Sequence, residues 1–214
     1  MPDSSHIAPP LPGFESVNRY WDRRLQCVAA KILPGEYYIS KGQEAITTVL
    51  GSCVAACIRD PVMGICGMNH FMLPLQSGES WSRDLAIESL ANRYGNHAME
   101  HLITDILKYG GRKKGLEVKI FGGARIIGGL TDIGDSNIRF VRNFLELENI
   151  GIAAQDVGGT NPRKIIFFPQ SGKVLVKKIQ DLHNDTISRR ETDYIDRLES
   201  SGREAVVDLF GQGS

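Results

Sequence analysis

Cys53 directly precedes the short apolar run Val54–Asp60, and His70 lies within a second run, Ile65–Leu73. A Pro-Val-Met-Gly sequence separates the two runs. Such runs around a turn that contains proline and glycine predict a β-hairpin. A two-residue loop sets Cys53 directly opposite His70, and a four-residue loop makes them diagonal neighbours on one face. Either register brings the imidazole close to the thiol. A thiol beside a histidine can ionise near neutral pH, and the thiolate is the nucleophilic form.

The residues before the cysteine supply two further groups for such a reaction. Gly51 gives the backbone the flexibility to aim an N–H group at a developing oxyanion. Thr47, on the preceding predicted strand, offers a hydroxyl that would orient the imidazole. The alternative interpretation is structural, with Cys53 a core thiol and His70 a buried histidine whose hydrogen bonds are satisfied.

An H-x-x-E-H string at residues 97–101 is a second candidate for chemistry. On a helix, two histidines four residues apart share one face and can bind zinc, with the glutamate as general base of a metallopeptidase. A third ligand would have to come from elsewhere, and no later glutamate stands out as one. Met99, inside the string, is needed for the apolar face of the helix. We therefore favour an exposed helix surface and expect no metal.

Paired glycines recur along the chain, but neither G-x-G-x-x-G nor G-x-x-x-x-G-K-[ST] occurs. Nothing therefore supports a nucleotide-binding loop. Gly122-Gly123 follows a predicted strand. We interpret this pair as a turn that lets the backbone pass close to a neighbouring element.

Length and composition limit the class of protein. The chain has 214 residues, of which 42% are hydrophobic, with 25 basic and 25 acidic side chains. These values predict one domain with a full core and exclude a disordered chain. Because basic and acidic side chains are equal in number, the chain lacks the excess of basic residues that is typical of nucleic-acid-binding proteins. Apolar runs are too short for membrane insertion and a signal-peptide pattern is lacking, so we expect a cytoplasmic protein with reduced cysteines.

The positions of the predicted elements indicate an α+β fold, because strands and two helices follow one another without strict alternation. A helix is expected from Asn96 to the Gly110-Gly111 stop, and a second over Phe140–Glu148. Besides the hairpin, short β-branched and aromatic runs predict strands at Glu36–Ser40, Ile46–Leu50, Val118–Phe121, Asn137–Phe140, Ile165–Phe168 and Val174–Lys177.

The two ends of the chain differ from this core. Residues 1–28 lack a clear period and are predicted to be an N-terminal extension with at most a short helix around Tyr20–Gln26. The folded domain is expected to span residues 29–179. Residues 180–214 are predicted to be a mobile, charged C-terminal tail with one amphipathic stretch, Glu191–Leu198, and an apolar docking patch at residues 206–210.

The sequences TVLGSCV at residues 48–54 and GMNHFMLP at residues 67–74 closely resemble the CheD family of chemoreceptor glutamine deamidases. Further matching stretches are Lys119–Ala124, Ile133-Gly134 with Asn137, and Asp156–Gly159 with Arg163. The resemblance covers about Leu33 to Lys178 and leaves both terminal extensions outside.

This resemblance implies a sandwich of short mixed and antiparallel strands with two main helices packed on it, similar to the catalytic domains of deamidating bacterial toxins. It implies Cys53 as the nucleophile, His70 as the base and Thr47 as the residue whose hydroxyl orients the base. The adjacent Thr48 is an alternative for this last role. The implied reaction is hydrolysis of receptor glutamine side chains to glutamate, without a cofactor. Methyl-ester hydrolysis at the same receptor sites would use the same groups.

The implied partners are the cytoplasmic helices of methyl-accepting chemotaxis receptors and, for some members of the family, the phosphatase CheC. A second hypothesis is a non-catalytic adaptor that binds receptors or CheC while its site stays idle. Selective labelling of Cys53 by a thiol-reactive substrate analogue would favour the enzyme.

Overall fold

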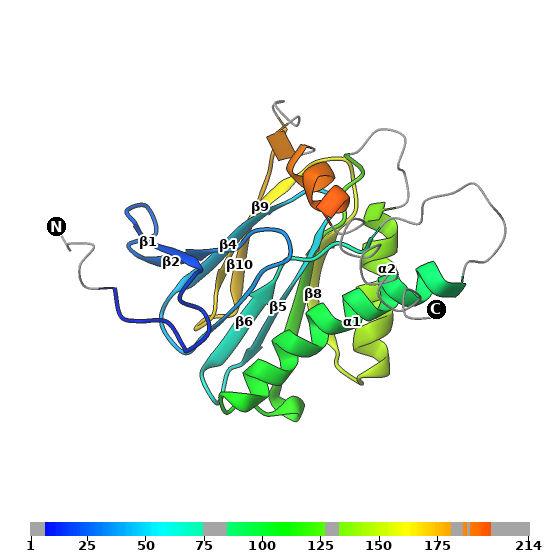
Figure 1. Cartoon of the computed structure of the whole chain (residues 1–214). Helices are drawn as coiled ribbons and strands as arrows, with labels where there is room; N and C mark the ends of the chain where they lie inside the picture. The colour runs from blue at the N-terminus through cyan, green and yellow to red at the C-terminus, as the bar shows by residue number, and fades with distance from the viewer. Residues whose placement is uncertain (1–6, 75–84, 127–132, 181–185, 188, 198–214) are drawn as a thin grey trace, which may run out of the picture.

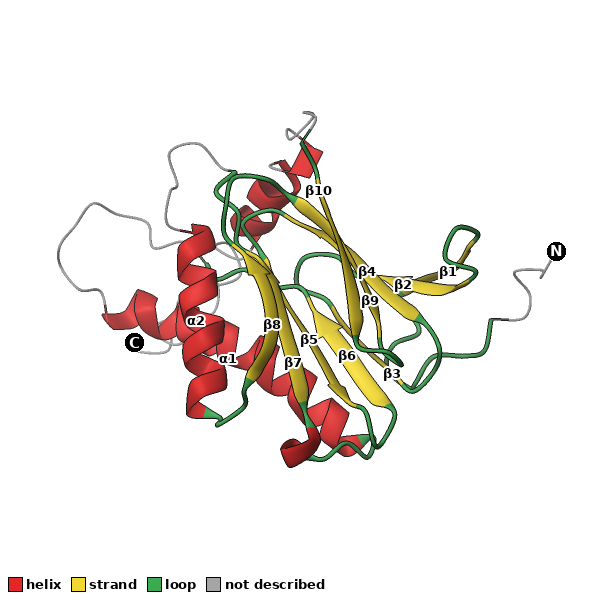
Figure 2. Cartoon of the chain, turned by 180° about the vertical axis from the view of Figure 1, so that it is seen from behind, coloured by secondary structure: helices red, strands yellow, loops and turns green. Residues whose placement is uncertain are grey.

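The computed structural model describes residues 7–74, 85–126, 133–180, 186–187 and 189–197. Within these residues two five-stranded sheets pack face to face, and two long helices cover the outer face of one sheet (Figure 1). Figure 2 shows the same three layers from behind. Each sheet is mixed, because one parallel pair stands among antiparallel ones in each. The predicted α+β class is confirmed.

The first sheet contains Asn18–Asp22 (β1), Cys27–Lys31 (β2), Ala45–Leu50 (β4), Arg163–Phe168 (β9) and Lys173–Lys178 (β10), in that order across the sheet. The second contains Tyr37–Ser40 (β3), Ile65–Asn69 (β6), Val54–Asp60 (β5), Glu117–Gly122 (β7) and Ile152–Val157 (β8), also in spatial order. The helices are Leu85–Lys108 (α1), the short 3-10 turn Lys113–Gly115 (η2) and Ile133–Leu147 (α2). A last helical segment covers residues 189–197.

Strand β5 is buried on both of its faces, and only Arg59 is partly exposed. Its Val-Ala-Ala-Cys-Ile run has no polar alternation, as expected for a strand with a sheet on one side and helices on the other. Helix α1 packs on β3, β5 and β6, and α2 packs on β5. The residues at the start of β5 therefore lie in the interior of the molecule.

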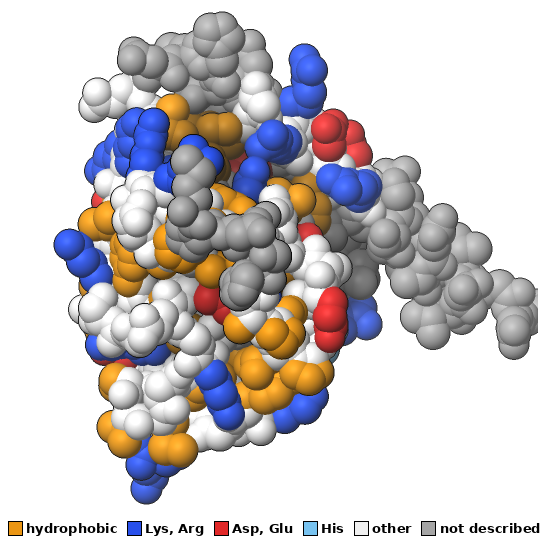
Figure 3. Space-filling view, turned by 90° about the vertical axis from the view of Figure 1, so that its left-hand side faces the viewer, with side chains coloured by type: hydrophobic (Ala, Val, Ile, Leu, Met, Phe, Trp, Pro, Cys, Tyr) orange, Lys and Arg blue, Asp and Glu red, His pale blue; other side chains and the backbone are white. Residues whose placement is uncertain are grey.

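Among the residues that the structure describes, helices cover the second sheet but not the outer face of the first, and β9 alternates accordingly. Ile165 and Phe167 point into the core, whereas Lys164 and Ile166 are half-buried. This alternation is typical of a sheet with one solvated face. Figure 3 shows the side of the molecule that is on the left in Figure 1. On this side, apolar side chains are interspersed with separate Lys and Arg side chains.

The hairpin that joins β5 to β6 has the register of a four-residue loop, with Asp60 paired to Ile65. The buried Asp60 carboxylate fixes the turn, because it accepts hydrogen bonds from the backbone N–H groups of Val62 and Met63 at 2.9 and 3.1 Å. Burial raises the pKa of Asp60, but these bonds and those from Arg112 outweigh it and leave the pKa below its ordinary value. One of the two predicted registers is thus confirmed.

At the N-terminus, the helix predicted around Tyr20–Gln26 is wrong. Aromatic side chains favour an extended backbone here, and β1 pairs with β2 in antiparallel register from Asp22 opposite Cys27. Gln26, in the turn, adopts a φ of 53°. Because β2 also pairs with β4, the extension predicted for residues 1–28 contributes strands to the first sheet.

The strand predicted at residues 137–140 is also wrong, because these residues belong to α2. The local β-propensity of Ile138 and Phe140 yields to a helical spacing of buried residues over the whole segment. These buried residues are Ile133, Gly134, Asn137, Ile138, Val141, Phe144 and Leu145. The second half of α2 confirms the helix predicted from Phe140, whereas β8 was not predicted.

Part of the predicted mobile tail packs on the core. Helical residues 189–197 bury Glu191, Tyr194 and Ile195, which are 2%, 8% and 3% exposed. In Figure 1 this orange segment lies over the upper end of the sheets. The apolar patch predicted at residues 206–210 lies outside the described residues. Among the helices described, none is both long and apolar enough to cross a membrane.

Candidate active site

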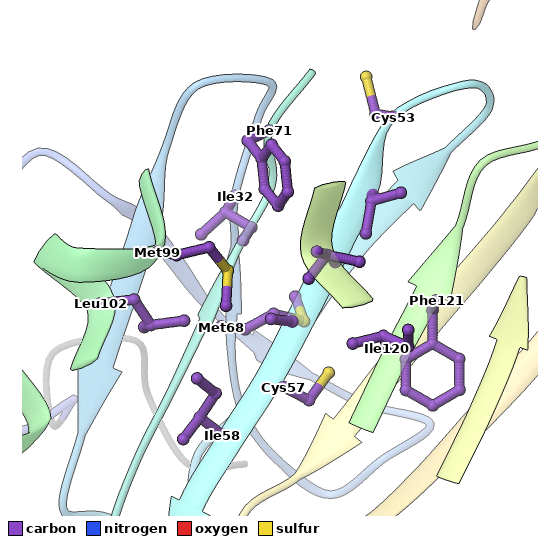
Figure 4. Close-up of a cluster of buried hydrophobic side chains, with 14 of the residues drawn as sticks. Ile32, Cys53, Cys57, Ile58, Met68, Phe71, Met99, Leu102, Ile120 and Phe121 are labelled. Atoms are coloured by element: carbon purple, nitrogen blue, oxygen red, sulfur yellow. The ribbon is translucent and has the colours of Figure 1, made fainter. Parts of the chain in front are cut away.

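Cys53 lies in the loop between β4 and β5 and is fully buried. In Figure 4 the sulfur of Cys53, just before the start of β5, points away from the labelled apolar side chains, whereas the sulfur of Cys57 lies among them. The two thiols thus differ in surroundings although they lie on one strand and its entry loop. Cys57 and Cys66 are core thiols, as predicted.

The segment Gly122–Ala124 holds the loop of Cys53 in place. The backbone N–H groups of Gly123 and Ala124 donate to the carbonyls of Cys53 and Gly51 at 2.8 and 2.7 Å. Gly122 has a φ of 110°, and a Cβ at this position would come 2.1 Å from the carbonyl oxygen of Cys53. Only glycine tolerates this conformation and this close approach. The predicted close-approach turn at Gly122-Gly123 is confirmed, and its neighbour is the backbone of Cys53.

His70 directly follows β6 and is 1% exposed. The hairpin register continues past the strands to a bridge between Val54 and Phe71, so His70 and Cys53 are the diagonal neighbours that a four-residue loop predicts. The backbone N–H of His70 donates to the carbonyl of Glu36 at 2.9 Å, and its carbonyl accepts from Gly35 at 2.7 Å. The imidazole is therefore held on a rigid segment.

Thr48 in β4 fixes the tautomer of this imidazole. Its Oγ1 lies 2.8 Å from Nδ1 of His70 and donates its proton to the carbonyl of Ile32, also at 2.8 Å. Because the hydroxyl proton is used, the oxygen accepts from Nδ1–H. Nε2 is then the basic nitrogen, and it is buried without a hydrogen-bond partner among the described residues.

The placement predicted for Thr47 is corrected by the structure. The Oγ1 of Thr47 donates to the carbonyl of Ile165 at 2.8 Å, within the first sheet. Side chains alternate along a strand, so Thr47 and Thr48 point to opposite faces, and only Thr48 faces His70. Thr48, the alternative residue named from the sequence, makes the contact with His70.

Three consecutive backbone N–H groups before and at Cys53 point at one anion. The carboxylate of Glu191, from helical residues 189–197, accepts from Gly51 and Ser52 at 2.9 Å each and from Cys53 at 3.4 Å. The hydroxyl of Ser52 donates to the same carboxylate at 2.5 Å. Successive N–H groups of this kind bind anions and can stabilise an oxyanion.

The reactive atoms of the site are close together and shielded from solvent. The ligand atoms of Cys53, His70 and Glu191 all lie within 4.8 Å of one another. Burial, and then the charge and hydrogen bond of Glu191, raise the pKa of the Cys53 thiol well above its ordinary value. Burial lowers the pKa of His70 to about 3. In this arrangement the site holds a neutral thiol and a neutral imidazole.

Asn137 in α2 connects the two halves of the site. Its Oδ1 accepts from the backbone N–H of Leu73 at 2.8 Å, and its Nδ2 donates to the carbonyl of Ser52 at 2.9 Å. One buried amide thus holds the loop of Cys53 against the segment that follows His70. The sequence does not predict this role of Asn137, because the local β-propensity of residues 137–140 indicates a strand and not the helix that positions the amide.

The histidines of the H-x-x-E-H string lie on the exposed face of α1. His97 and His101 stack with ring centroids 3.9 Å apart, and Glu100 is exposed beside them. Met99 is fully buried, as the predicted apolar face requires. Within the described residues, the only group of three potential metal ligands is that of Cys53, His70 and Glu191.

Glu191 was also missed as a site residue, although the sequence contains a signal for it. Glu191 precedes Tyr194 and Ile195 by three and four residues, so it shares the apolar face of the predicted amphipathic stretch. A carboxylate on the apolar face of a helix needs buried hydrogen-bond donors. Sequence spacing alone does not show where those donors are.

A thiol within 4.8 Å of a ring nitrogen of an oriented imidazole, next to aligned backbone N–H groups, is the arrangement of a thiol hydrolase. The family model described as CheD chemotactic sensory transduction matches residues 72–178. "Probable chemoreceptor glutamine deamidase CheD" of Hahella chejuensis is 53% identical over 94% of this chain and 93% of the relative. The protein of the same name from Halorhodospira halophila is 48% identical, with the same coverage of both chains. The chain belongs to the CheD family.

Proposed function

We propose that this protein deamidates glutamine side chains of chemotaxis receptors, with Cys53 as nucleophile and His70 as general base and acid. The observation that carries the proposal is the set of N–H groups at Gly51, Ser52 and Cys53, which bind a side-chain carboxyl group beside the thiol. The names of the relatives support the substrate.

The reaction follows from the positions of these groups. Nε2 of His70 takes the proton of Cys53, and the thiolate attacks the side-chain carbonyl of glutamine. The backbone N–H groups hold the oxyanion of the tetrahedral intermediate. The imidazolium then gives its proton to the leaving ammonia. Water, activated by the same imidazole, hydrolyses the thioester to glutamate and restores the thiol.

Thr48 takes the orienting role in this mechanism, because its hydroxyl is the one that contacts His70. The hydroxyl touches neither the substrate nor the thiol, so it is a positioning residue. We also propose that the protein acts in the cytoplasm, and that the phosphatase CheC, which some members of the family bind, is a further partner. Hydrolysis of a glutamate methyl ester would use the same nucleophile, base and N–H groups.

The test mixes the full-length protein with a receptor cytoplasmic fragment and follows the conversion of amide to acid by peptide mass spectrometry, together with released ammonia. Cys53→Ala is expected to abolish the conversion. His70→Ala is expected to lower the rate by roughly 10²–10⁴-fold. A methylated fragment in parallel measures ester hydrolysis.

An intact receptor fragment after incubation with wild-type protein would contradict the proposal. If the fragment is still bound in that experiment, the adaptor function takes its place. Binding of purified CheC, with and without the fragment, decides whether the phosphatase is a partner.

A further inference from the structure

The carboxylate of Glu191 occupies the position that a reaction product would take. Deamidation leaves a glutamate side chain whose carboxylate lies on the N–H groups that held the oxyanion. Glu191 is itself a glutamate, presented from a helix, and its two oxygens accept three backbone N–H groups and the hydroxyl of Ser52. Its side chain is thus bound as the product would be.

The surface around the site is shaped for this helix. A Cβ at Gly51 would come 2.2 Å from Cδ1 of Ile126 and 2.8 and 2.9 Å from the two carboxylate oxygens, so the carboxyl group fits here because position 51 has no side chain. A Cβ at Gly35 would come 2.6 Å from the hydroxyl oxygen of Tyr194. The hydroxyl of Tyr194 also contacts that of Tyr94 in α1. The helix is therefore anchored by two side chains, Glu191 at the loop of Cys53 and Tyr194 beside Gly35 and Tyr94.

From this placement we propose that helical residues 189–197 are a built-in competitive inhibitor, in which Glu191 closes the active site as a tethered product mimic. The inhibitor leaves the site when a receptor helix with a glutamine side chain takes its place. Because the helix belongs to the same chain, its effective concentration can reach the mM range, which compensates for the weak binding of a single product side chain. This inference rests on the proposed function for the identity of the competing substrate.

The electrostatics of the closed site agree with inhibition. A carboxylate within 4.8 Å of the thiol opposes formation of the thiolate, and burial of His70 opposes formation of the imidazolium. A catalytic carboxylate would need a free lone pair toward the substrate. Each oxygen of Glu191 already accepts two hydrogen bonds from the loop, which uses the four acceptor sites of the carboxylate. The same engagement disfavours Glu191 as a metal ligand.

The first experiment measures alkylation of Cys53 by iodoacetamide in the full-length protein, mapped by peptide mass spectrometry. An open state populated at 0.1–10% slows the reaction by roughly 10- to 1000-fold. Glu191→Ala is expected to raise the alkylation rate of Cys53 at least about 10-fold. Asp193→Ala, which removes an exposed acid from the same helix, is the matched control and should leave the rate unchanged.

A second variant keeps the test valid if Glu191→Ala unfolds. Tyr194→Ala loosens the helix without changing the N–H groups at the site, and it should also raise the alkylation rate. Circular dichroism and thermal melting show whether each variant is folded. Because alkylation needs no receptor, this result stands even if the proposed deamidation fails.

The second experiment measures deamidation kinetics on the receptor fragment. An intramolecular competitor reduces the fraction of protein that can bind substrate, so Glu191→Ala should lower KM about 10-fold or more and leave kcat unchanged. A fall in kcat would instead make Glu191 part of the catalytic machinery and overturn the proposal. Equal alkylation rates in folded wild type and Glu191→Ala would overturn it too, as would stoichiometric zinc that is lost in Glu191→Ala.

Discussion

The Oγ1 of Thr48 lies 2.8 Å from Nδ1 of His70, and this hydrogen bond joins the two sheets of the sandwich. Thr48 belongs to β4 in the first sheet, whereas His70 follows β6 in the second. The tautomer of the imidazole is therefore set by how the sheets pack on each other. Activity should depend on a residue that never meets the substrate.

Thr48→Ala is expected to lower the deamidation rate by roughly 10–100-fold, the equivalent of about 1–3 kcal/mol for a lost buried hydrogen bond. Thr48→Ser retains the hydroxyl and should restore most of the activity, which a purely structural defect would not predict. Thr47→Ala is the matched control, because Thr47 donates to Ile165 away from the site. An inactive Thr47→Ala with an active Thr48→Ala would reverse the assignment.

The sequence allowed the pair of Cys53 and His70 to be predicted because both follow from one local hairpin. Its turn contains Asp60, proline and glycine, and the resulting register fixes which side chains share a face. The choice between Thr47 and Thr48 needed the packing of β4 against the other sheet. That packing is set by contacts between distant residues, and a one-residue change reverses the face.

Asn137→Ala should destabilise the fold and weaken activity together. The substitution leaves the backbone N–H of Leu73 and the carbonyl of Ser52 buried without their partner, at a cost of about 1–3 kcal/mol. Urea unfolding measures the loss in free energy. Arg139→Ala, an exposed site on the same helix, should change it little. Equal stabilities of the two variants would show that water replaces the amide.

The buried neutral imidazole of His70 makes stability depend on pH. Burial lowers its pKa from 6.5 to about 3 in the folded protein, so between these values the unfolded chain binds more protons. The contribution of the neutral imidazole to the free energy of unfolding is fully present above about pH 6.5 and is lost as the pH falls toward 3. His70→Gln should therefore flatten the fall in unfolding free energy below about pH 6.5, by at most ~1.4 kcal/mol per pH unit. Urea unfolding of both proteins at several pH values measures the slopes.

Carboxyl groups whose pKa is lowered in the fold also reduce the stability of the protein as the pH falls, and they are present in both wild type and His70→Gln. Asp60, whose pKa is lowered in the fold, gives both a residual fall at acid pH. The difference between wild type and His70→Gln isolates the imidazole. Identical slopes would mean that His70 is protonated or hydrated in the folded state.

Glu191 shows why the rest of the site was not predicted. Its helix contacts a loop that lies about 140 residues earlier in the chain. In addition, an isolated acidic residue in a charged tail is normally solvated. Its burial depends on Gly51, Ser52 and Cys53 presenting their N–H groups together. No local pattern around residue 191 records that arrangement.

The pose of Glu191 leads to a last prediction. If its side chain lies as a product would, Glu191→Gln places an amide in front of Cys53, and the enzyme should deamidate its own chain. The thiolate would attack the new side-chain carbonyl, ammonia would leave with a proton from His70, and water would hydrolyse the thioester to restore glutamate. Intact-protein and peptide mass spectrometry should show loss of ammonia and then conversion of amide to acid at position 191. Cys53→Ala combined with Glu191→Gln should keep the amide. Persistence of the amide in a variant that still deamidates the receptor fragment would show that the helix does not present this side chain as a substrate does.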